Sequence, residues 1–214
     1  KSYLLRGKAF LSIPNPIDTK VYHPMDQGMA RELLGLPLGK RLLLFGALNV
    51  TDKRKGIDYL IEALRRMEKQ DVELVVFGQV KDDIRGLFPV PIHSMGYLSD
   101  ESKIVALYNA VDMFITSSLE ENLPNTIMES MACGTPCVGF EIGGIPEMID
   151  HRVNGYVANY KDAGDLANGI QWVLEHEDRL ALSDACVKKV QENYTEEVVA
   201  KQYTALYEKL LKGE

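Results

Sequence analysis

Short apolar runs alternate with amphipathic stretches along most of the chain. The runs are rich in leucine and β-branched residues and nearly continuous, which is typical of parallel strands buried on both faces. The predicted strands are 41–46, 72–78, 91–96, 111–116 and 136–140. The predicted helices are 56–69, 99–110, 124–133, 162–175, 178–192 and 195–212. This alternation predicts an α/β fold: a Rossmann-like, doubly wound parallel sheet with helices on both faces and a ligand beyond the carboxyl ends of the strands.

Composition narrows the class of protein. A chain of 214 residues can form one α/β domain with a sizeable core. A net charge of −7 argues against nucleic acid as a partner, and no apolar run approaches the roughly 18 residues of a membrane span. The three cysteines form no C-x-x-C pair and are expected to be reduced structural thiols. We therefore expect a cytoplasmic protein, and leave peripheral membrane association of the full-length protein open.

The segment from Glu121 to Glu129 places two carboxylates around a predicted helix start. Pro124 suits the first helical position, so the amides of Asn125 and Thr126 lie in a first turn without intrahelical partners. Such a turn favours phosphate, and Glu129 stands about 7.5 Å further along the axis. A nucleotide sugar, which joins two polyols through phosphate, fits this layout. The alternative is an ordinary capped helix with solvated glutamates.

Two further groups follow predicted strands. The basic run Lys53-Arg54-Lys55 comes after the strand that ends near Gly46, and is either a phosphate-binding group or a solvated turn. Gly78 and the loop Gly96-Tyr97-Leu98 also stand at strand ends, although Tyr97 is equally well explained as an ordinary half-buried aromatic residue. No Asp-x-Asp, G-x-G-x-x-G or P-loop motif occurs, and the four histidines are scattered, so we predict no metal site and no cofactor.

Five segments in order resemble the family 4 glycosyltransferases of GT-B fold. They are Ile13-Pro14-Asn15-Pro16-Ile17-Asp18, Lys55-Gly56-Ile57-Asp58-Tyr59-Leu60, Val111-Asp112-Met113-Phe114-Ile115-Thr116-Ser117-Ser118, the stretch 121–129, and Gly143-Gly144-Ile145-Pro146-Glu147 followed by Asn154-Gly155. Each segment alone is weak evidence. Their order across about 200 residues makes the resemblance specific.

The resemblance implies that residues 1–214 are a single donor-binding domain, with the acceptor-binding domain absent from this chain. The full enzyme would move a hexosyl group from a nucleoside-diphosphate sugar to an acceptor hydroxyl, with retention and without metal. The acceptor would be a carbohydrate or a lipid-linked molecule, as in polysaccharide biosynthesis, and this chain alone would be inactive. Two alternatives stay open: a non-catalytic nucleotide-sugar-binding module, or a sugar-nucleotide epimerase of the same fold.

The resemblance also assigns roles. Lys55 would bind the diphosphate, and Arg54 would replace an arginine that the family commonly has at the position of Ala47. Glu121 would accept hydroxyls of the donor sugar and Glu129 those of the ribose. The remaining predicted donor contacts are Asn122, Leu123, Asn125, Thr126, Gly78, Tyr97 and Leu98. Nucleotide, sugar, acceptor and oligomeric state are not assigned.

Overall fold

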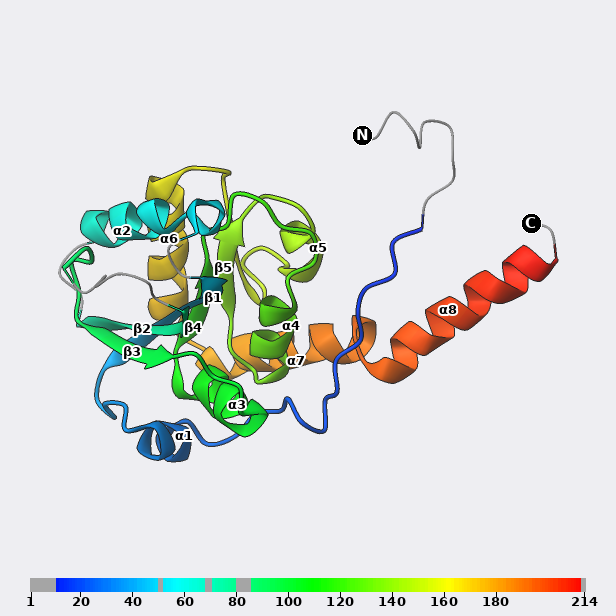
Figure 1. Cartoon of the computed structure of the whole chain (residues 1–214), viewed down its shortest axis with the longest axis horizontal. Coiled ribbons are helices and arrows are strands. Elements are labelled where there is room, and N and C mark those ends of the chain that lie inside the picture. The colour runs from blue at the N-terminus through cyan, green and yellow to red at the C-terminus, as the bar shows by residue number, and fades with distance from the viewer. Residues whose placement is uncertain (1–10, 50–51, 68–70, 80–85, 213–214) are drawn as a thin grey trace.

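The computed structural model describes residues 11–49, 52–67, 71–79 and 86–212. At its centre is a six-stranded sheet in the order β3-β2-β1-β4-β5-β6, and every pair of neighbours is parallel (Figure 1). The strands are β1 (Arg41–Asn49), β2 (Val72–Gln79), β3 (Ile92–Gly96), β4 (Met113–Thr116), β5 (Cys137–Phe140) and β6 (Gly155–Ala158). The sequence prediction of a doubly wound parallel sheet is confirmed, and the structure adds its strand order.

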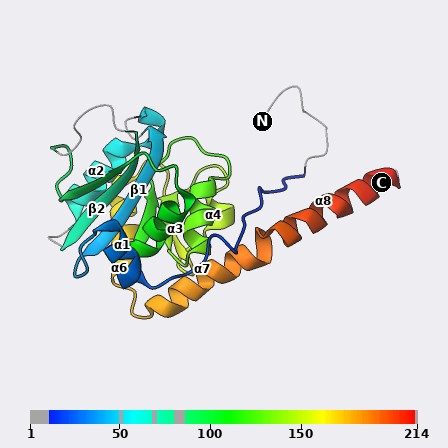
Figure 2. The same ribbon diagram turned by 60° about the horizontal axis from the view of Figure 1, so that its bottom comes forward.

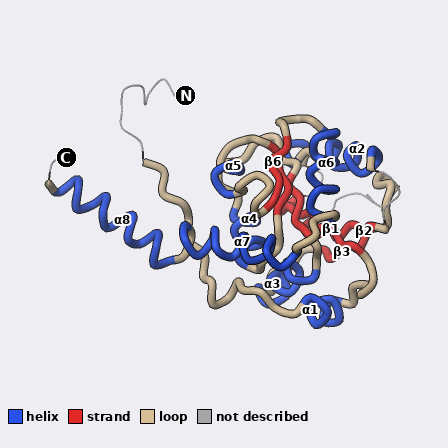
Figure 3. The backbone as a smooth tube through the Cα atoms, turned by 180° about the vertical axis from the view of Figure 1, so that it is seen from behind, coloured by secondary structure: helices blue, strands red, loops and turns tan. Residues whose placement is uncertain are grey.

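Helices cover both faces of the sheet (Figures 1 and 3). On one face α2 packs against α6; on the other α1, α3, α4 and α7 follow one another. The helices are α1 (Gln27–Leu34), α2 (Ile57–Arg66), α3 (Glu101–Ala110), α4 (Asn125–Ala132), α5 (Ile145–Met148), α6 (Ala163–Leu174), α7 (Arg179–Asn193) and α8 (Glu196–Leu211), with a 3-10 turn η2 (Lys53–Lys55) after β1.

Strand β1 shows why the sequences of the strands are continuous apolar runs. Successive side chains point to opposite faces of a sheet. Leu43 and Phe45 accordingly join the core beneath α2 and α6, while Leu42 and Leu44 join the core beneath the other helices. Because both faces are covered by helices, the central positions of the strand, 42–45, are all apolar and buried.

The predicted elements are confirmed, with small shifts at their ends and three omissions. Helix α4 begins at Asn125 with Pro124 as its N-cap, one residue later than predicted. Helix α3 begins at Glu101, two residues later than predicted, and is capped by Asp100, whose carboxylate accepts the Ser102 amide at 3.0 Å. Positions 68 and 69 of a predicted helix lie outside the described residues. Strand β6 and helices α1 and α5 were not predicted.

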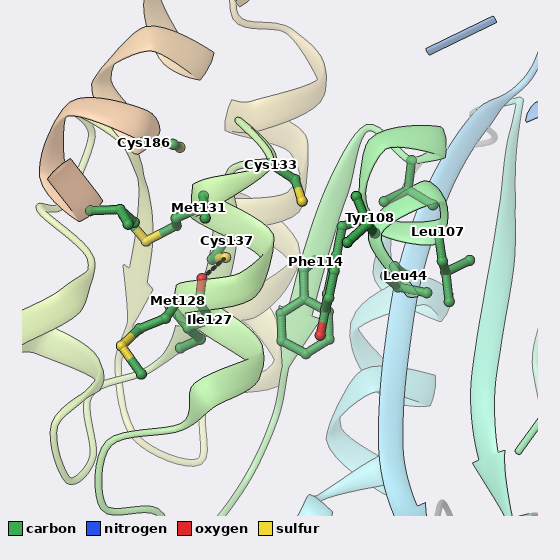
Figure 4. Packing of buried hydrophobic residues seen from close by; sticks show 14 of the residues in the cluster. Leu44, Leu107, Tyr108, Phe114, Ile127, Met128, Met131, Cys133, Cys137 and Cys186 are labelled. Carbon is green, nitrogen blue, oxygen red and sulfur yellow. Dashed lines mark hydrogen bonds between the residues drawn. The ribbon is translucent and has the colours of Figure 1, made fainter. Parts of the chain in front are cut away.

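The hydrophobic core on the α1, α3, α4 and α7 side of the sheet contains all three cysteines (Figure 4). Cys133, Cys137 and Cys186 are buried free thiols, as the sequence predicted. Burial raises the pKa of both Cys133 and Cys137 to about 12, so these thiols stay protonated at neutral pH. Their role in the fold is packing.

Helix α8 extends away from the body of the domain (Figures 1 and 2). At its base, the amide of Ile17 donates to the Tyr194 carbonyl at 2.8 Å, which ties the N-terminal segment to the α7–α8 junction. No helix in the described part of the chain is long and apolar enough to cross a bilayer.

An ion-pair cluster fixes the amino end of β4. The buried carboxylate of Asp112 accepts from the Arg31 guanidinium at 3.1 Å and from the Leu42 amide at 2.6 Å, and Arg179 at the start of α7 also donates to it. Burial raises the pKa of Asp112, while these donors and the nearby Arg41 oppose the rise. The cluster joins α1, β1, β4 and α7.

Candidate functional site

The site centres on an ion pair between Lys55 and Glu121. The Lys55 ammonium donates to the Glu121 carboxylate at 2.6 Å, and the two side chains are 33% and 14% exposed. Lys55 ends the 3-10 turn after β1, whereas Glu121 lies in the loop after β4. The strand order reverses between β1 and β4, so the pair stands at the topological switch point where doubly wound sheets bind ligands.

Hydrogen bonds to backbone carbonyls hold the turn that carries Lys55 against the β4–α4 loop. The Ser117 hydroxyl donates to the Lys55 carbonyl at 3.0 Å, and the Leu119 amide donates to the Arg54 carbonyl at 2.7 Å. Gly56 has a φ of +64°, and a Cβ there would lie 1.9 Å from the Ser117 carbonyl oxygen. Glycine is therefore required for the turn to approach the loop so closely.

The other side of this loop rests on Gly143 and Gly144. The Gly144 amide donates to the Asn122 carbonyl at 2.5 Å, and a Cβ on Gly143 would lie 2.1 Å from the Glu121 carbonyl oxygen. The Tyr160 hydroxyl adds a hydrogen bond to the Leu119 carbonyl at 3.0 Å. These contacts fix the backbone that carries Glu121, Asn122 and Leu123. The sequence signal for them was the glycine pair; nothing in the sequence indicated Tyr160.

The first turn of α4 presents free amides beside this loop. Pro124 makes no side-chain capping bond, and its carbonyl accepts the Ile127 amide at 3.0 Å. Among the described residues, the amides of Asn125 and Thr126 have no hydrogen-bond partner. They are donors at the positive end of the helix dipole, suited to an anion.

Glu129 lies one turn further along α4 and is partly buried. The Tyr108 hydroxyl donates to its carboxylate at 2.8 Å, and the Phe77 ring packs edge-on against Tyr108. Burial raises the pKa of Glu129, and the charge of Glu101 raises it further against the opposing hydrogen bond. Sequence reasoning did not identify Tyr108 or Glu101 as neighbours of Glu129, because they belong to a different helix.

The other predicted site residues have different surroundings. Arg54 pairs with Asp52 at 2.6 Å, and its hydrogen bonds lower the pKa of that carboxyl to about 2. Gly78 is buried at the end of β2, Tyr97 is 62% exposed and Leu98 packs partly against the core. Within the described part of the chain, no hydrogen bond or ion pair joins these side chains to Lys55 or Glu121.

The described residues contain no group of three His, Cys, Asp or Glu side chains that could hold a metal ion. A partly open cavity of about 180 Å³ lies at the amino ends of β4 and β5, away from the Lys55–Glu121 pair. The candidate site itself is formed by loops at the carboxyl ends of the strands.

This fold and site define a class of protein, and comparison with known sequences identifies it. The sequence model described as "Glycosyl transferases group 1" matches residues 39–176. The chain therefore belongs to the group 1 glycosyltransferases. It is 24% identical over 214 residues to N-acetyl-alpha-D-glucosaminyl L-malate synthase of Bacillus anthracis. That alignment covers 97% of this chain and 56% of the relative, so the chain spans about half the length of the relative that it matches.

Solved structures of glycosyltransferases share the fold. Sucrose-phosphate synthase from Thermosynechococcus elongatus superposes with a TM-score of 0.78 at 25% identity, over 94% of this chain and 53% of that one. HepE from Anabaena, in complex with UDP-glucose, superposes with a TM-score of 0.76 at 21% identity, over 92% of this chain and 56% of that one. Both show the GT-B glycosyltransferase architecture in this domain.

Proposed function

We propose that this chain is the donor-binding domain of a retaining, metal-independent glycosyltransferase. The enzyme would move a hexosyl group from a nucleoside-diphosphate sugar to an acceptor hydroxyl. One observation carries the proposal: the Lys55–Glu121 ion pair stands at the switch point of the sheet, beside the free amides that begin α4. Cationic, acidic and amide groups are thus gathered where a diphosphate and its sugar would lie.

Lys55 and the first-turn amides would stabilise the leaving diphosphate. As the glycosidic bond to the diphosphate breaks, negative charge grows on the phosphate oxygens. An ammonium group has three N–H donors, and the bond to Glu121 uses one of them. The other two remain for phosphate oxygens without rupture of the ion pair. The amides of Asn125 and Thr126 would add fixed donors that need no rearrangement.

Glu121 would hold the transferred sugar while it stays paired with Lys55. An ionised carboxylate offers about four acceptor positions, and Lys55 occupies one. The remaining positions would accept sugar hydroxyls. The pair would then orient the sugar relative to the diphosphate, because one member binds each part of the donor.

Glu129 would accept the ribose hydroxyls, with Tyr108 orienting its carboxylate. A carboxylate is the better acceptor when it is ionised, so its raised pKa makes this contact sensitive to acid. Gly78, Tyr97 and Leu98 would lie nearer the nucleobase. Arg54 would contribute through Nη1, because Asp52 accepts only from its Nε and Nη2.

The identity of the donor, the acceptor and the activity of the whole protein belong to the proposal. The UDP-glucose complex of HepE supports uridine diphosphate as the first ligand to test. The acceptor would be bound by a partner domain, so we expect this chain alone to bind nucleotide without robust transfer. Absence of metal dependence and retention at the anomeric carbon stay predictions.

Calorimetric titration of the chain with UDP, GDP and ADP tests the proposal. One of them should bind, and Lys55→Ala should lower its affinity at least about tenfold, since a hydrogen bond to a charged group is worth roughly 1.5–3 kcal/mol. Lys53→Ala is the matched control, because Lys53 is an exposed lysine in the same turn. Equal losses in both variants, or no binding of any of the three nucleotides, would contradict the proposal.

A further inference from the structure

A cavity of about 180 Å³ opens at the amino ends of β4 and β5, opposite the candidate donor site. Its walls come from the segment before α1, the end of α3, the turn after α4 and the first turns of α7. Among the lining residues are Gln27, Asp112, Gly134, Thr135, Arg179 and Ser183. Nothing in the proposed donor chemistry uses this cavity.

Guanidinium groups surround the one carboxylate that lines the cavity. Asp112 lies within ion-pair distance of Arg31, Arg41 and Arg179, and of these three Arg179 lines the cavity. The neighbouring carboxylate of Asp178 accepts the Ala181 amide at 2.9 Å as the N-cap of α7.

Three carbonyls in the cavity wall already have donors. The Val111 carbonyl accepts from the Gln27 side-chain amide at 3.0 Å, and the Thr135 carbonyl accepts from the Ser130 hydroxyl, also at 3.0 Å. The Pro136 carbonyl accepts the Phe114 amide at 2.9 Å. The fold itself therefore uses these three acceptors.

Donor groups, by contrast, are left over. In the described structure, Arg179 bonds only to Asp112 through Nη2, so its Nε and Nη1 hydrogens are free. The Ser183 hydroxyl, one turn further along α7, also has no partner among the described residues. The Arg179 side chain is 38% exposed and thus accessible from solvent.

We propose that this cavity binds a small tetrahedral oxyanion of the phosphate class, held by the guanidinium of Arg179 and the hydroxyl of Ser183. The planar fork of a guanidinium matches two phosphate oxygens, and a hydroxyl supplies a third contact. The volume suffices for one such anion with a water molecule, whose share of liquid volume is about 30 Å³. Bound anion would join the start of α7 to the turn after α4 and so stabilise the folded state.

Thermal unfolding of the chain in sodium phosphate, against sodium chloride at equal ionic strength, tests this site. At ten times the dissociation constant, phosphate should raise Tm by about 3–6 °C for a domain of this size. Arg179→Gln should abolish the rise. Because phosphate could also occupy the proposed donor site, Lys55→Ala is measured in parallel and should keep the rise.

Ser183→Asp provides a second test that does not remove the Arg179–Asp112 bond. Its carboxylate would stand four residues from Arg179 on the same helix and occupy the anion position. We expect a higher Tm without phosphate and no further response to it. Ala181→Asp adds the same charge to an exposed position of α7 and should leave the phosphate response intact. No rise above chloride, or a rise that Lys55→Ala abolishes while Ser183→Asp retains it, would overturn the proposal.

Discussion

The two ends of β4 each carry an acidic side chain in an ion pair, and the two pairs differ in construction. Before the strand, Asp112 is 3% exposed and bonds to Arg31, Arg179 and the Leu42 amide. After the strand, Glu121 is 14% exposed, and among the described residues its one ion-pair partner is Lys55, which is itself a third exposed. The first carboxylate has nearly all its acceptor capacity filled by the fold, while the second keeps most of it for a ligand.

This difference separates a structural ion pair from a functional one. Removing one partner of a buried pair leaves an unpaired buried charge, which is strongly destabilising. The Lys55–Glu121 pair is partly exposed, so it is better hydrated and contributes less to folding than the buried pair. Its members can therefore be selected for binding, at small cost to the stability of the domain.

The largest expected effect comes from disrupting the buried ion pair before β4. Arg31→Met should lower the free energy of unfolding by about 3–5 kcal/mol, since it removes the buried cationic partner of Asp112 and leaves the Ala110, Leu38 and Lys40 carbonyls without this donor. Urea denaturation measures the change. Arg41→Met is the control: Arg41 stands 3.6 Å from the same carboxylate but is 48% exposed, so the loss should be below about 1 kcal/mol.

Similar losses for Arg31→Met and Arg41→Met would show that burial does not decide the strength of these pairs. The distinction between the two ends of β4 would then fail.

The next largest effect concerns the Lys55–Glu121 pair after β4. Glu121→Gln should lower sugar transfer by the full-length enzyme about 10- to 1,000-fold, because a charged acceptor of the donor sugar is lost. Affinity for the nucleoside diphosphate should hold or rise, since Lys55 is freed from its partner. Steady-state kinetics and calorimetry measure the two quantities.

The neighbouring exposed residue supplies the control for Glu121. Glu120→Gln should change neither transfer nor affinity. A loss of diphosphate affinity in Glu121→Gln equal to the loss in transfer would mean that Glu121 positions Lys55 and does not hold the sugar.

A smaller effect tests the close approach of the 3-10 turn to the β4–α4 loop. Gly56→Ala introduces a left-handed residue, at roughly 1–2 kcal/mol, and a Cβ that meets the Ser117 carbonyl. Nucleotide affinity should fall along with stability, because Lys55 must move. Gly35→Ala has the same strain, with a φ of +65°, but its Cβ would meet nothing within 4 Å. Gly35→Ala should lower stability and leave nucleotide affinity unchanged. A loss of nucleotide affinity in both variants would show that the close approach at Gly56 does not position Lys55.

The smallest effect is on stability and concerns Glu129, which has no cationic partner among the described residues. Its pKa is raised by burial in the folded state. The folded protein therefore binds this proton more tightly than the unfolded chain, and the ionised form lowers stability above the raised pKa. Glu129→Gln should change the unfolding free energy at pH 7 by less than about 1 kcal/mol, in the stabilising direction. The difference should disappear as the pH falls below the unfolded pKa.

Protonation of Glu129 should affect nucleotide affinity and stability in opposite directions. In the unmodified chain, nucleotide affinity should fall as the pH drops through the raised pKa of Glu129, because the protonated carboxyl is a poorer acceptor for the ribose. Glu129→Gln should bind more weakly and without this dependence. Calorimetric titrations between pH 5 and 8 on both proteins measure it. An identical pH profile in the variant would place the titrating group elsewhere.

Much of the fold could be predicted because its signals are local. Continuous apolar runs located β1 to β5, and helical periodicity located α2, α3, α4, α6, α7 and α8. Strand β6 is as short as β4 and β5, but two of its four residues are glycine and alanine, and it is a strand by virtue of pairing with β5. Helix α5 is equally short, and α1 has two apolar side chains, Met29 and Leu33, on its exposed side, which obscures the pattern of a buried face.

The sequence by itself determined which groups are present for chemistry: Lys55 after one strand, Glu121 after another and Glu129 inside a helix. Only the tertiary structure decided how they are partnered. Lys55 and Glu121 meet across 66 residues, Tyr108 reaches Glu129 from a neighbouring helix, and Arg179 meets Asp112 across 67 residues. Such contacts depend on strand order and on where each connection returns to the sheet. Local propensity determines each element, whereas the packing of elements distant in sequence determines which charges share a site.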